Sequence, residues 1–244
     1  MNTGSRSLTG VWFDLARAGN FPSVCSNVLA ALALSTPVAA AWPDARTGLL
    51  AALGGMLAYA GGTTLNDVFD AGFDRRHRPD RAIPSGIISR SLAGWVGAIQ
   101  LAAGAALLLV LPAKAALVLG LVACILLYDW LHKRWTGSVV LMAGCRVLLG
   151  LTLASVPGHA FTPALVSWVV LLGGYIIVLS LLARREYLPG APKIKLGRQV
   201  GRLLAFIPLV DALALLSVGA WPIAIVCALA IPLGRLAQRL SASN

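Results

Sequence analysis

Residues 53–74 read LGGMLAYAGGTTLNDVFDAGFD, an apolar, glycine-rich run that passes directly into a group of acids. Asp67, Asp70 and Asp74 are three of only nine acidic residues in the chain, and Asn66 precedes them. Their spacing places the three carboxylates on one face of a helix, where like charges repel. Because a bound cation would remove that repulsion, the stretch predicts a transmembrane helix that ends in a metal site.

The composition of the whole chain indicates a membrane protein. Hydrophobic residues make up 58% and charged residues 12%, with a mean hydropathy of +0.82, whereas a soluble domain has about 25% charged residues. Apolar runs of about 20 residues, enough to cross a bilayer, recur throughout. We expect one all-α integral-membrane domain over residues 1–244, a polytopic bundle of about eight helices with a ninth left open. The expected spans are Phe21–Trp42, Thr47–Asp67, Leu92–Leu111, Ala113–Trp130, Ser138–Val156, Pro163–Ala183, Leu203–Gly219 and Trp221–Leu236.

The basic residues predict which way the bundle faces. Lysines and arginines gather in every second connection and at both ends of the chain, and only Arg46 and Lys114 fall in connections on the other side. Since cytoplasmic loops are the ones enriched in Lys and Arg, both termini and the acidic cluster are expected on the cytoplasmic side. In a bacterium this would be the inner, or plasma, membrane. The same asymmetry accounts for the net charge of +11 without nucleic acid.

The loop after the acids suits a phosphate ligand. Carboxylate and amide oxygens are hard ligands of the kind that Mg²⁺ prefers, and Mg²⁺ commonly completes its shell with water and substrate phosphates. Arg78 and Arg81 follow within the loop and would donate to those phosphates. Pro79 and Pro84 stiffen it, and Gly86 permits a tight turn. The alternative interpretation is a solvated, charged loop at the membrane surface.

These motifs resemble those of a known family. The pattern Asn66-Asp67-x-x-Asp70-x-x-x-Asp74, followed by Arg78-Pro79-x-Arg81-x-Ile83-Pro84-Ser85-Gly86, is similar to the first aspartate motif of the UbiA superfamily of intramembrane prenyltransferases. The resemblance implies helices around a lipid-accessible cavity. It further implies Mg²⁺-assisted departure of diphosphate from an allylic prenyl donor and capture of the prenyl group by a small acceptor. The implied metal ligands are Asn66, Asp67, Asp70 and Asp74, the three acids being catalytic.

The second cytoplasmic connection is similar to another element of that superfamily, a tyrosine followed by Lys-Arg. The resemblance implies that Tyr128 faces the allylic cation or the donor chain. It also implies that Lys133 and Arg134 meet the diphosphate. The alternative is an aromatic belt with ordinary positive-inside anchors.

The third basic loop departs from the superfamily, which usually carries a second aspartate cluster there. In this chain Glu186 is the only acid, next to Arg184 and Arg185. Two hypotheses stay open: Glu186 completes the first metal site and is catalytic, or Arg184 and Arg185 replace the charge of a second metal at the diphosphate. This form, together with Cys145-Arg146 and Gly150, resembles the EboC-like branch of the superfamily.

Two charged residues lie inside expected spans, where charge is costly and is usually paired or functional. One hypothesis is a direct ion pair between Arg146 and Asp211. The other has Arg146 reaching the diphosphate or an acidic acceptor, with Asp211 orienting it. The four cysteines lie in different spans without paired spacing, so we expect them to pack as small apolar residues.

The alternatives to prenyl transfer are a secondary transporter, a non-catalytic membrane protein, and a phosphotransferase of the CDP-alcohol type. Transporters place charges near the bilayer midplane, whereas here the acids cluster at its edge. The expected partners are a prenyl diphosphate, a small-molecule acceptor and membrane lipid. No nucleic acid and no protein partner is indicated. The acceptor is left open among a hydroxybenzoate-like ring, a quinone precursor and a sugar or polyol phosphate.

Overall fold

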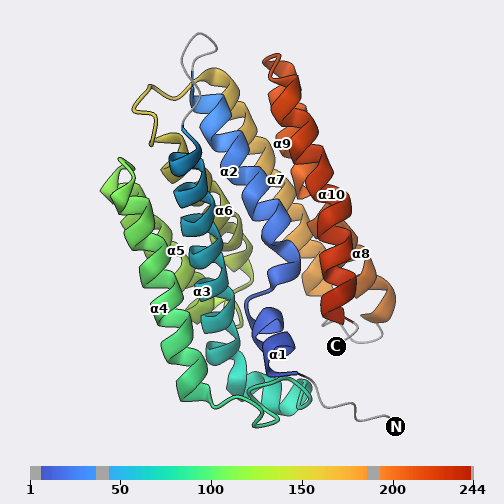
Figure 1. Cartoon of the computed structure of the whole chain (residues 1–244). Coiled ribbons are helices and arrows are strands. Elements are labelled where there is room, and N and C mark those ends of the chain that lie inside the picture. Colours follow the sequence, from blue (N-terminus) through green and yellow to red (C-terminus); the bar gives the residue numbers. More distant parts are fainter. Residues whose placement is uncertain (1–6, 37–43, 186–192, 243–244) are drawn as a thin grey trace.

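A computed structural model describes residues 7–36, 44–185 and 193–242, and helices form nearly all of this part (Figure 1). Short 3₁₀ turns, η1 (Ala18–Asn20) and η2 (Thr136–Ser138), precede α2 and α6. The helices are α1 (Leu8–Leu15), α2 (Phe21–Ser35), α3 (Ala45–His77), α4 (Arg90–Val110), α5 (Ala115–Leu131), α6 (Val139–Ala154), α7 (Pro163–Arg184), α8 (Lys193–Ala205), α9 (Ile207–Ser217) and α10 (Trp221–Ala242).

Each expected span overlaps a helix of the structure, although residues 37–42 of the first span lie outside the described residues and the seventh span begins in α8 before it continues in α9. Among the described residues, six helical segments are long and apolar enough to cross a membrane, and α5 is a shorter apolar helix. Large apolar side chains such as Trp95, Ile99, Val170 and Leu229 are exposed on the outside of the bundle, as expected for a surface that faces lipid. The polytopic all-α membrane fold is therefore confirmed.

Helix α3 differs most from its expected bounds, because it continues past Asp67 to His77. At about 1.5 Å per residue its 33 residues extend for about 50 Å, compared with a hydrocarbon core of about 30 Å. Arg75, Arg76 and His77 occupy its last turn, where positive charge stabilises a helix terminus. The acids thus stand on the final turns of a helix that is longer than the membrane core is thick.

Helices α3 and α4 approach so closely that their contact requires glycine. A Cβ added at Gly61 would lie 2.5 Å from the backbone nitrogen of Leu101, and one at Gly104 would lie 2.5 Å from that of Ala58. Small residues permit this backbone-to-backbone packing in membranes. Within the glycine-rich run, Gly54 and Gly61 therefore pack against α4, whereas Gly55 faces Val28 of α2 and Gly62 faces Ile125 of α5.

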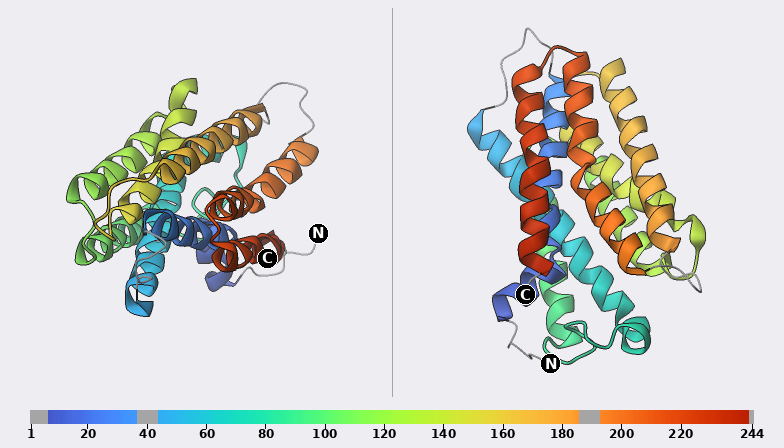
Figure 2. Two further views of the ribbon diagram at one scale, coloured as in Figure 1. Left: turned by 90° about the horizontal axis from the view of Figure 1, so that it is seen from above. Right: turned by 90° about the vertical axis from the view of Figure 1, so that its right-hand side faces the viewer.

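Helix α2 lies at the centre of the bundle and packs against α3, α6, α7, α9 and α10. Seen from above, the other helices surround it, with α3, α4 and α5 on one side and α9 and α10 on the other (Figure 2). Helix α1, the C-terminal end of α10 and the acidic end of α3 lie at the same end of the bundle (Figure 1). The three elements thus share one end of the bundle, and the cytoplasmic location of that end stays a prediction.

The connection after α3 is held by a small core of its own. Ile83 and Ile88 are buried in a cluster with Val11 and Leu15 of α1, separate from the main core. Gly86 has a φ of +80°, a left-handed conformation that glycine adopts readily, and so the expected turn forms there. This packing fixes the position of Arg81 beside the acids.

Candidate active site

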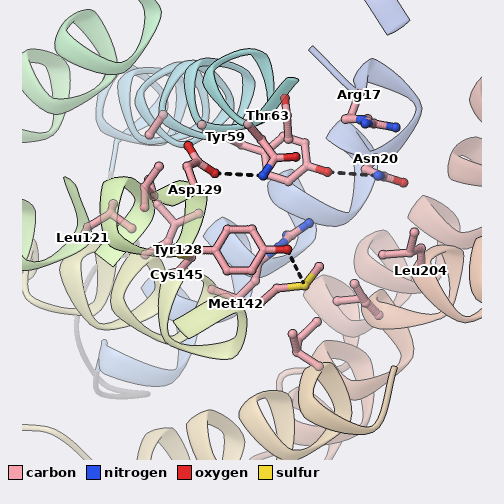
Figure 3. Close-up of a pocket in the computed structure, with 18 residues that line it drawn as sticks. Arg17, Asn20, Tyr59, Thr63, Leu121, Tyr128, Asp129, Met142, Cys145 and Leu204 are labelled. Atoms are coloured by element: carbon pink, nitrogen blue, oxygen red, sulfur yellow. Dashed lines mark hydrogen bonds between the residues drawn. The ribbon is translucent and has the colours of Figure 1, made fainter. Parts of the chain in front are cut away.

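Two of the cavities between the described helices adjoin each other. The inner one, of about 330 Å³, has mainly apolar walls that include Leu121, Ile125, Leu149, Ile176 and Ile207. The outer one, of about 550 Å³, lies at the acidic end of α3. Both are lined by Arg17, Asn66, Tyr128 and Met142, so the cavities meet at these side chains. Figure 3 shows the residues that line the inner cavity, with Arg17, Tyr128 and Met142 among those labelled. An apolar chamber thus opens towards a charged one.

Asp67 and Asp74 share one arginine as their partner. The Nη1 of Arg81 donates to Asp74 at 2.8 Å and lies 3.3 Å from Asp67. Asp67 also accepts from Arg17 at 3.0 Å. Loss of solvation lowers the pKa of Arg17, but Asp67, with smaller contributions from Tyr59 and Asp74, raises it above its usual value. The repulsion between these two carboxylates is therefore relieved by arginines.

Asp70 faces a different set of cations. Its carboxylate lies 3.1 Å from the Nε2 of His132 and 3.2 Å from the Nζ of Lys133, both at the end of α5. The Nζ of Lys133 also lies 4.5 Å from the ring centroid of Phe73. Asp70 is only 4% exposed. This carboxylate therefore joins α3 to the connection that follows α5.

Asn66 is oriented by a buried acid from α5. Its Nδ2 donates to the Oδ1 of Asp129 at 3.1 Å, while the Oδ2 of Asp129 has no hydrogen-bond partner within the described chain. Asp129 is 4% exposed and lines the inner cavity. Because its amide nitrogen faces Asp129, the carbonyl oxygen of Asn66 is the atom left for a metal or ligand.

Tyr128 stands where the two cavities meet. Its hydroxyl donates to the sulfur of Met142 at 3.6 Å, and its ring stacks on His132 with centroids 5.0 Å apart. Both contacts hold the ring in the wall, and Figure 3 shows the one with Met142. An aromatic face at this junction can stabilise a nearby positive charge.

The remaining sequence-predicted cations occupy varied positions. Arg184 lines the outer cavity but donates to the carbonyls of His132 and Trp135 and, at 2.6 Å, to Ser138. Arg78 ends α3 through its backbone, with its N–H donating to the carbonyl of Asp74. Arg134 lies over the ring of Trp130, and Arg185 is exposed at the end of α7. The predicted acid of this region, Glu186, lies outside the described residues.

The hypothesis of a direct ion pair between Arg146 and Asp211 is wrong, because the side chain of Asn27 lies between them. The Nη1 of Arg146 donates to the Oδ1 of Asn27 at 2.7 Å, and the Nδ2 of Asn27 donates to Asp211 at 2.8 Å. A single amide can accept from the guanidinium and donate to the carboxylate at the same time. The two charges are therefore connected without touching.

The acids could hold a metal only with help from other ligands. Among the described residues, no three acidic, histidine or cysteine side chains converge as a metal cage. Mg²⁺ commonly uses one or two protein carboxylates and takes its other oxygens from water and phosphate. The carboxylates of Asp67, Asp70 and Asp74 and the carbonyl of Asn66 fit that chemistry. Such a site would be complete only with a phosphate ligand present.

Several features of the site escape prediction from the sequence. His132 and Asp129 were not predicted as site residues, although an acid so close to an apolar run is itself a signal of function. Arg17 has a φ of 49°, the only left-handed non-glycine conformation in the described chain. Such strained conformations often accompany functional sites, but a sequence does not show them.

Comparison with known sequences places the chain in a family. A sequence model of the UbiA prenyltransferase family matches residues 24–244. Digeranylgeranylglyceryl phosphate synthase of Thermococcus gammatolerans is 34% identical over 134 residues, which cover 52% of this chain and 48% of that protein. Its counterpart in Pyrococcus abyssi is 40% identical over 78 residues, covering 32% and 28%. The chain therefore spans about half the length, or less, of these curated relatives.

Solved structures share the architecture. A structure of digeranylgeranylglyceryl phosphate synthase has a TM-score of 0.61 at 19% identity, covering 95% of this chain and 91% of that one. A UbiA homolog from Archaeoglobus fulgidus bound to GPP and Mg²⁺ has a TM-score of 0.60 at 17% identity, covering 93% and 99%. At this level of identity the likeness is one of fold.

Proposed function

This chain belongs to the UbiA prenyltransferase family, and on that premise we propose that it transfers an isoprenyl group from an allylic prenyl diphosphate to a small acceptor within the membrane. The observation that carries the proposal is the junction of the two cavities at Asn66 and Tyr128. An apolar chain fits the inner cavity, where each buried CH₂ contributes about 0.8 kcal/mol. The diphosphate then lies in the outer cavity, among the acids and cations.

Mg²⁺ is the proposed cofactor, held by Asn66, Asp67, Asp70 and Asp74 together with the diphosphate. The metal would neutralise charge on the departing diphosphate. The homolog from Archaeoglobus fulgidus was solved with GPP and Mg²⁺, which supports this assignment for the present chain. Glu186 remains a proposed further ligand, and it lies outside the described residues.

The cations of the outer cavity are proposed to bind the phosphates. Arg81 and Lys133 now contact the carboxylates of Asp74 and Asp70, and a diphosphate would give them stronger, charge-assisted partners. Arg184 lines the same cavity, although its present bonds hold the connection after α5. Fixed positive charge around a leaving group lowers the barrier to its departure without reorganisation of solvent.

Tyr128 is proposed to face the allylic carbon as it becomes positive. The ring lies between the apolar and charged cavities, where the donor's first carbon would have to sit. Its face can attract the developing cation, and the apolar walls exclude the water that would otherwise capture it. The acceptor takes the prenyl group from that position.

The acceptor and the orientation belong to the proposal as well. Curated relatives named digeranylgeranylglyceryl phosphate synthase favour a glyceryl phosphate-like acceptor, and a small aromatic ring is the second candidate. The distribution of Lys and Arg supports a cytoplasmic position for both termini and for the outer cavity.

A transfer assay tests the proposal. The purified chain in liposomes is given labelled allylic prenyl diphosphates of several lengths, each with an aromatic or a glyceryl phosphate acceptor. We expect prenylated product that depends on Mg²⁺ and disappears when EDTA is added. Absence of product with every pair, from protein that is folded and binds the donor, would contradict the proposed function.

A further inference from the structure

We propose that the inner cavity, beside the prenyl chain, also binds the anionic group of the acceptor, a carboxylate or a phosphate, through the guanidinium of Arg146. The inference rests on the proposed function, because it names the chemical class of the acceptor. Asn27 and Asp211 act as positioning residues that hold Arg146 in place.

The contacts of Arg146 leave it able to bind a ligand. It donates to Asn27 at 2.7 Å and to Ser23 at 3.2 Å, and its guanidinium lies 4.9 Å from the ring centroid of Tyr59. An arginine has five N–H donors, so donors remain beyond these two bonds to described residues. Arg146 is 8% exposed and lines the inner cavity. Its accessible atoms therefore can meet a molecule bound there.

Asp211 does not neutralise Arg146 by direct contact. Its fully buried carboxylate accepts from Ser26 at 2.6 Å, from Trp168 at 2.8 Å and from Asn27 at 2.8 Å. All three donors are neutral, and they satisfy the carboxylate without a cation. The side-chain oxygen of Asn27 accepts a hydrogen bond from Arg146. The network fixes the guanidinium while leaving part of it to face the cavity.

The depth of Arg146 separates it from the site of the diphosphate. It follows Val139, the first residue of α6, by two helical turns, or about 10 Å at 1.5 Å per residue. The outer cavity already has Arg17, Arg81 and Lys133 around the acids. A second anion bound at the depth of Arg146 therefore has to belong to the other substrate.

An anion at this position is also what electrostatics favours. The cavity wall around Arg146 is largely apolar, with Leu149, Ile176 and Ile207 among its members. A charged side chain facing such surroundings is costly unless it is paired, and inside membrane proteins it commonly marks a substrate site. A carboxylate or phosphate on the acceptor would accept two parallel N–H bonds from the guanidinium. The neutral analogue of the same acceptor would lack this partner.

Ligand binding to the full chain in detergent tests the proposal without requiring turnover. Two matched probe pairs are used: 4-hydroxybenzoate with neutral 4-hydroxybenzamide, and a monoalkylglyceryl phosphate with the neutral monoalkylglycerol. Affinities are measured from the rise in thermal stability with probe concentration. We expect the wild-type protein to bind the anionic member of one pair at least about tenfold more tightly. The pair that shows the preference distinguishes a carboxylate on a ring from a phosphate on glycerol.

Variants then assign the preference to Arg146. Arg146→Gln should abolish it, and Arg146→Lys, which keeps the charge but loses the planar fork, should retain part of it. Asp211→Asn should weaken anion binding without changing the affinity for geranyl diphosphate with Mg²⁺. Lys114→Gln, which removes a cation from the opposite end of the bundle, is the matched control and should keep the full preference. If Arg146→Gln does not fold, Arg146→Lys and Asp211→Asn carry the comparison.

Three results would overturn the inference. These are equal wild-type affinity for the anionic and neutral members of both pairs, an unchanged preference in the Arg146 variants, and weakened binding of geranyl diphosphate in place of the acceptor probes. Because the assay measures binding alone, a chain that binds the anion but transfers no prenyl group would contradict the proposed function and leave the anion site standing.

Discussion

The guanidinium of Arg81 lies 2.8 Å from the Oδ2 of Asp74 and also 3.3 Å from Asp67, which stands about two turns earlier on the same face of α3. It occupies the position in which a cation was expected between the acids. A diphosphate with Mg²⁺ would offer both sides of this contact a new partner, the metal for the carboxylates and the phosphate for the arginine. The ion pair therefore holds the site in order before substrate binds.

Replacing Arg81 with Gln should weaken donor binding. The amide keeps polar contacts to the acids but removes the charge for phosphate, so we expect the KM for the prenyl diphosphate to rise at least about tenfold. Steady-state kinetics at saturating acceptor provides the measurement. Arg76→Gln, at an exposed position in the last turn of the same helix, is the control. A similar loss in both variants would mean that only general surface charge matters.

Asp129 is expected to act on the metal site through Asn66. Asp129→Leu removes the acceptor that orients Asn66, and loss of such an outer partner typically lowers metal affinity by about 10- to 100-fold. Asp129→Asn can keep the hydrogen bond to Asn66 while it removes the buried charge of the carboxylate. One oxygen of that carboxylate has no partner within the described chain. We therefore expect Asp129→Asn to retain more of the Mg²⁺ affinity than Asp129→Leu and to melt no lower than wild type.

The Mg²⁺ concentration that gives half-maximal turnover measures this effect, with thermal melts recorded in parallel. Leu126→Ala, a change at a lipid-facing residue of the same helix, controls for general damage to α5. An unchanged Mg²⁺ requirement in Asp129→Leu would show that Asn66 does not depend on Asp129.

The fold was largely predictable because apolar length and basic loops are local properties of the sequence. The exact end of α3 could not be predicted from local sequence. Its polar last turns are stabilised by ion pairs with Arg17, His132 and Lys133, which come from distant parts of the chain. Periodicity alone cannot foresee such partners. The same holds for Asn27, whose place between Arg146 and Asp211 depends on how α2 packs against α6 and α9.

The close approach of α3 and α4 predicts a sharp difference between two glycine substitutions. Gly61→Ala places a methyl group 2.5 Å from a backbone nitrogen of α4, and overpacking of this kind costs about 1 to 3 kcal/mol. Gly48→Ala, on the same helix, meets no atom within 4 Å and should be neutral or stabilising. Thermal melts of the two variants in detergent make the comparison. Equal melting temperatures would contradict this packing.

Cys124 and Cys145 offer a test of how α5 lies against α6. Their sulfur atoms are 3.7 Å apart, although the sequence spacing suggested only separate packing roles. Mild oxidation in membranes should therefore link them, as shown by loss of maleimide labelling that a reductant restores. Cys124→Ser should prevent the link, whereas Cys227→Ser should not. Unimpeded labelling of both cysteines after oxidation would contradict the placement of the two helices.

The predicted site residues fall into two groups for a physical reason. Those on the regular helix α3 keep their spacing, so their common location followed from the sequence. The positions of three cations near helix ends, Arg134, Arg184 and Arg185, did not follow from the sequence. Loop conformation decides where such a long side chain reaches. Arg184 holds the connection after α5, and Arg134 lies over Trp130. Motif spacing could not separate these roles from phosphate binding.

The most direct test of the account is Mg²⁺-dependent prenyl transfer by Asp67→Asn and Asp70→Asn beside the wild-type protein. Both amides keep the size of the side chain but remove the charge that binds the metal. At saturating donor and acceptor we expect each variant to lose at least about 100-fold in turnover, with folding confirmed by an unchanged elution profile. Turnover equal to wild type in both variants would contradict the claim that these acids form the catalytic metal site.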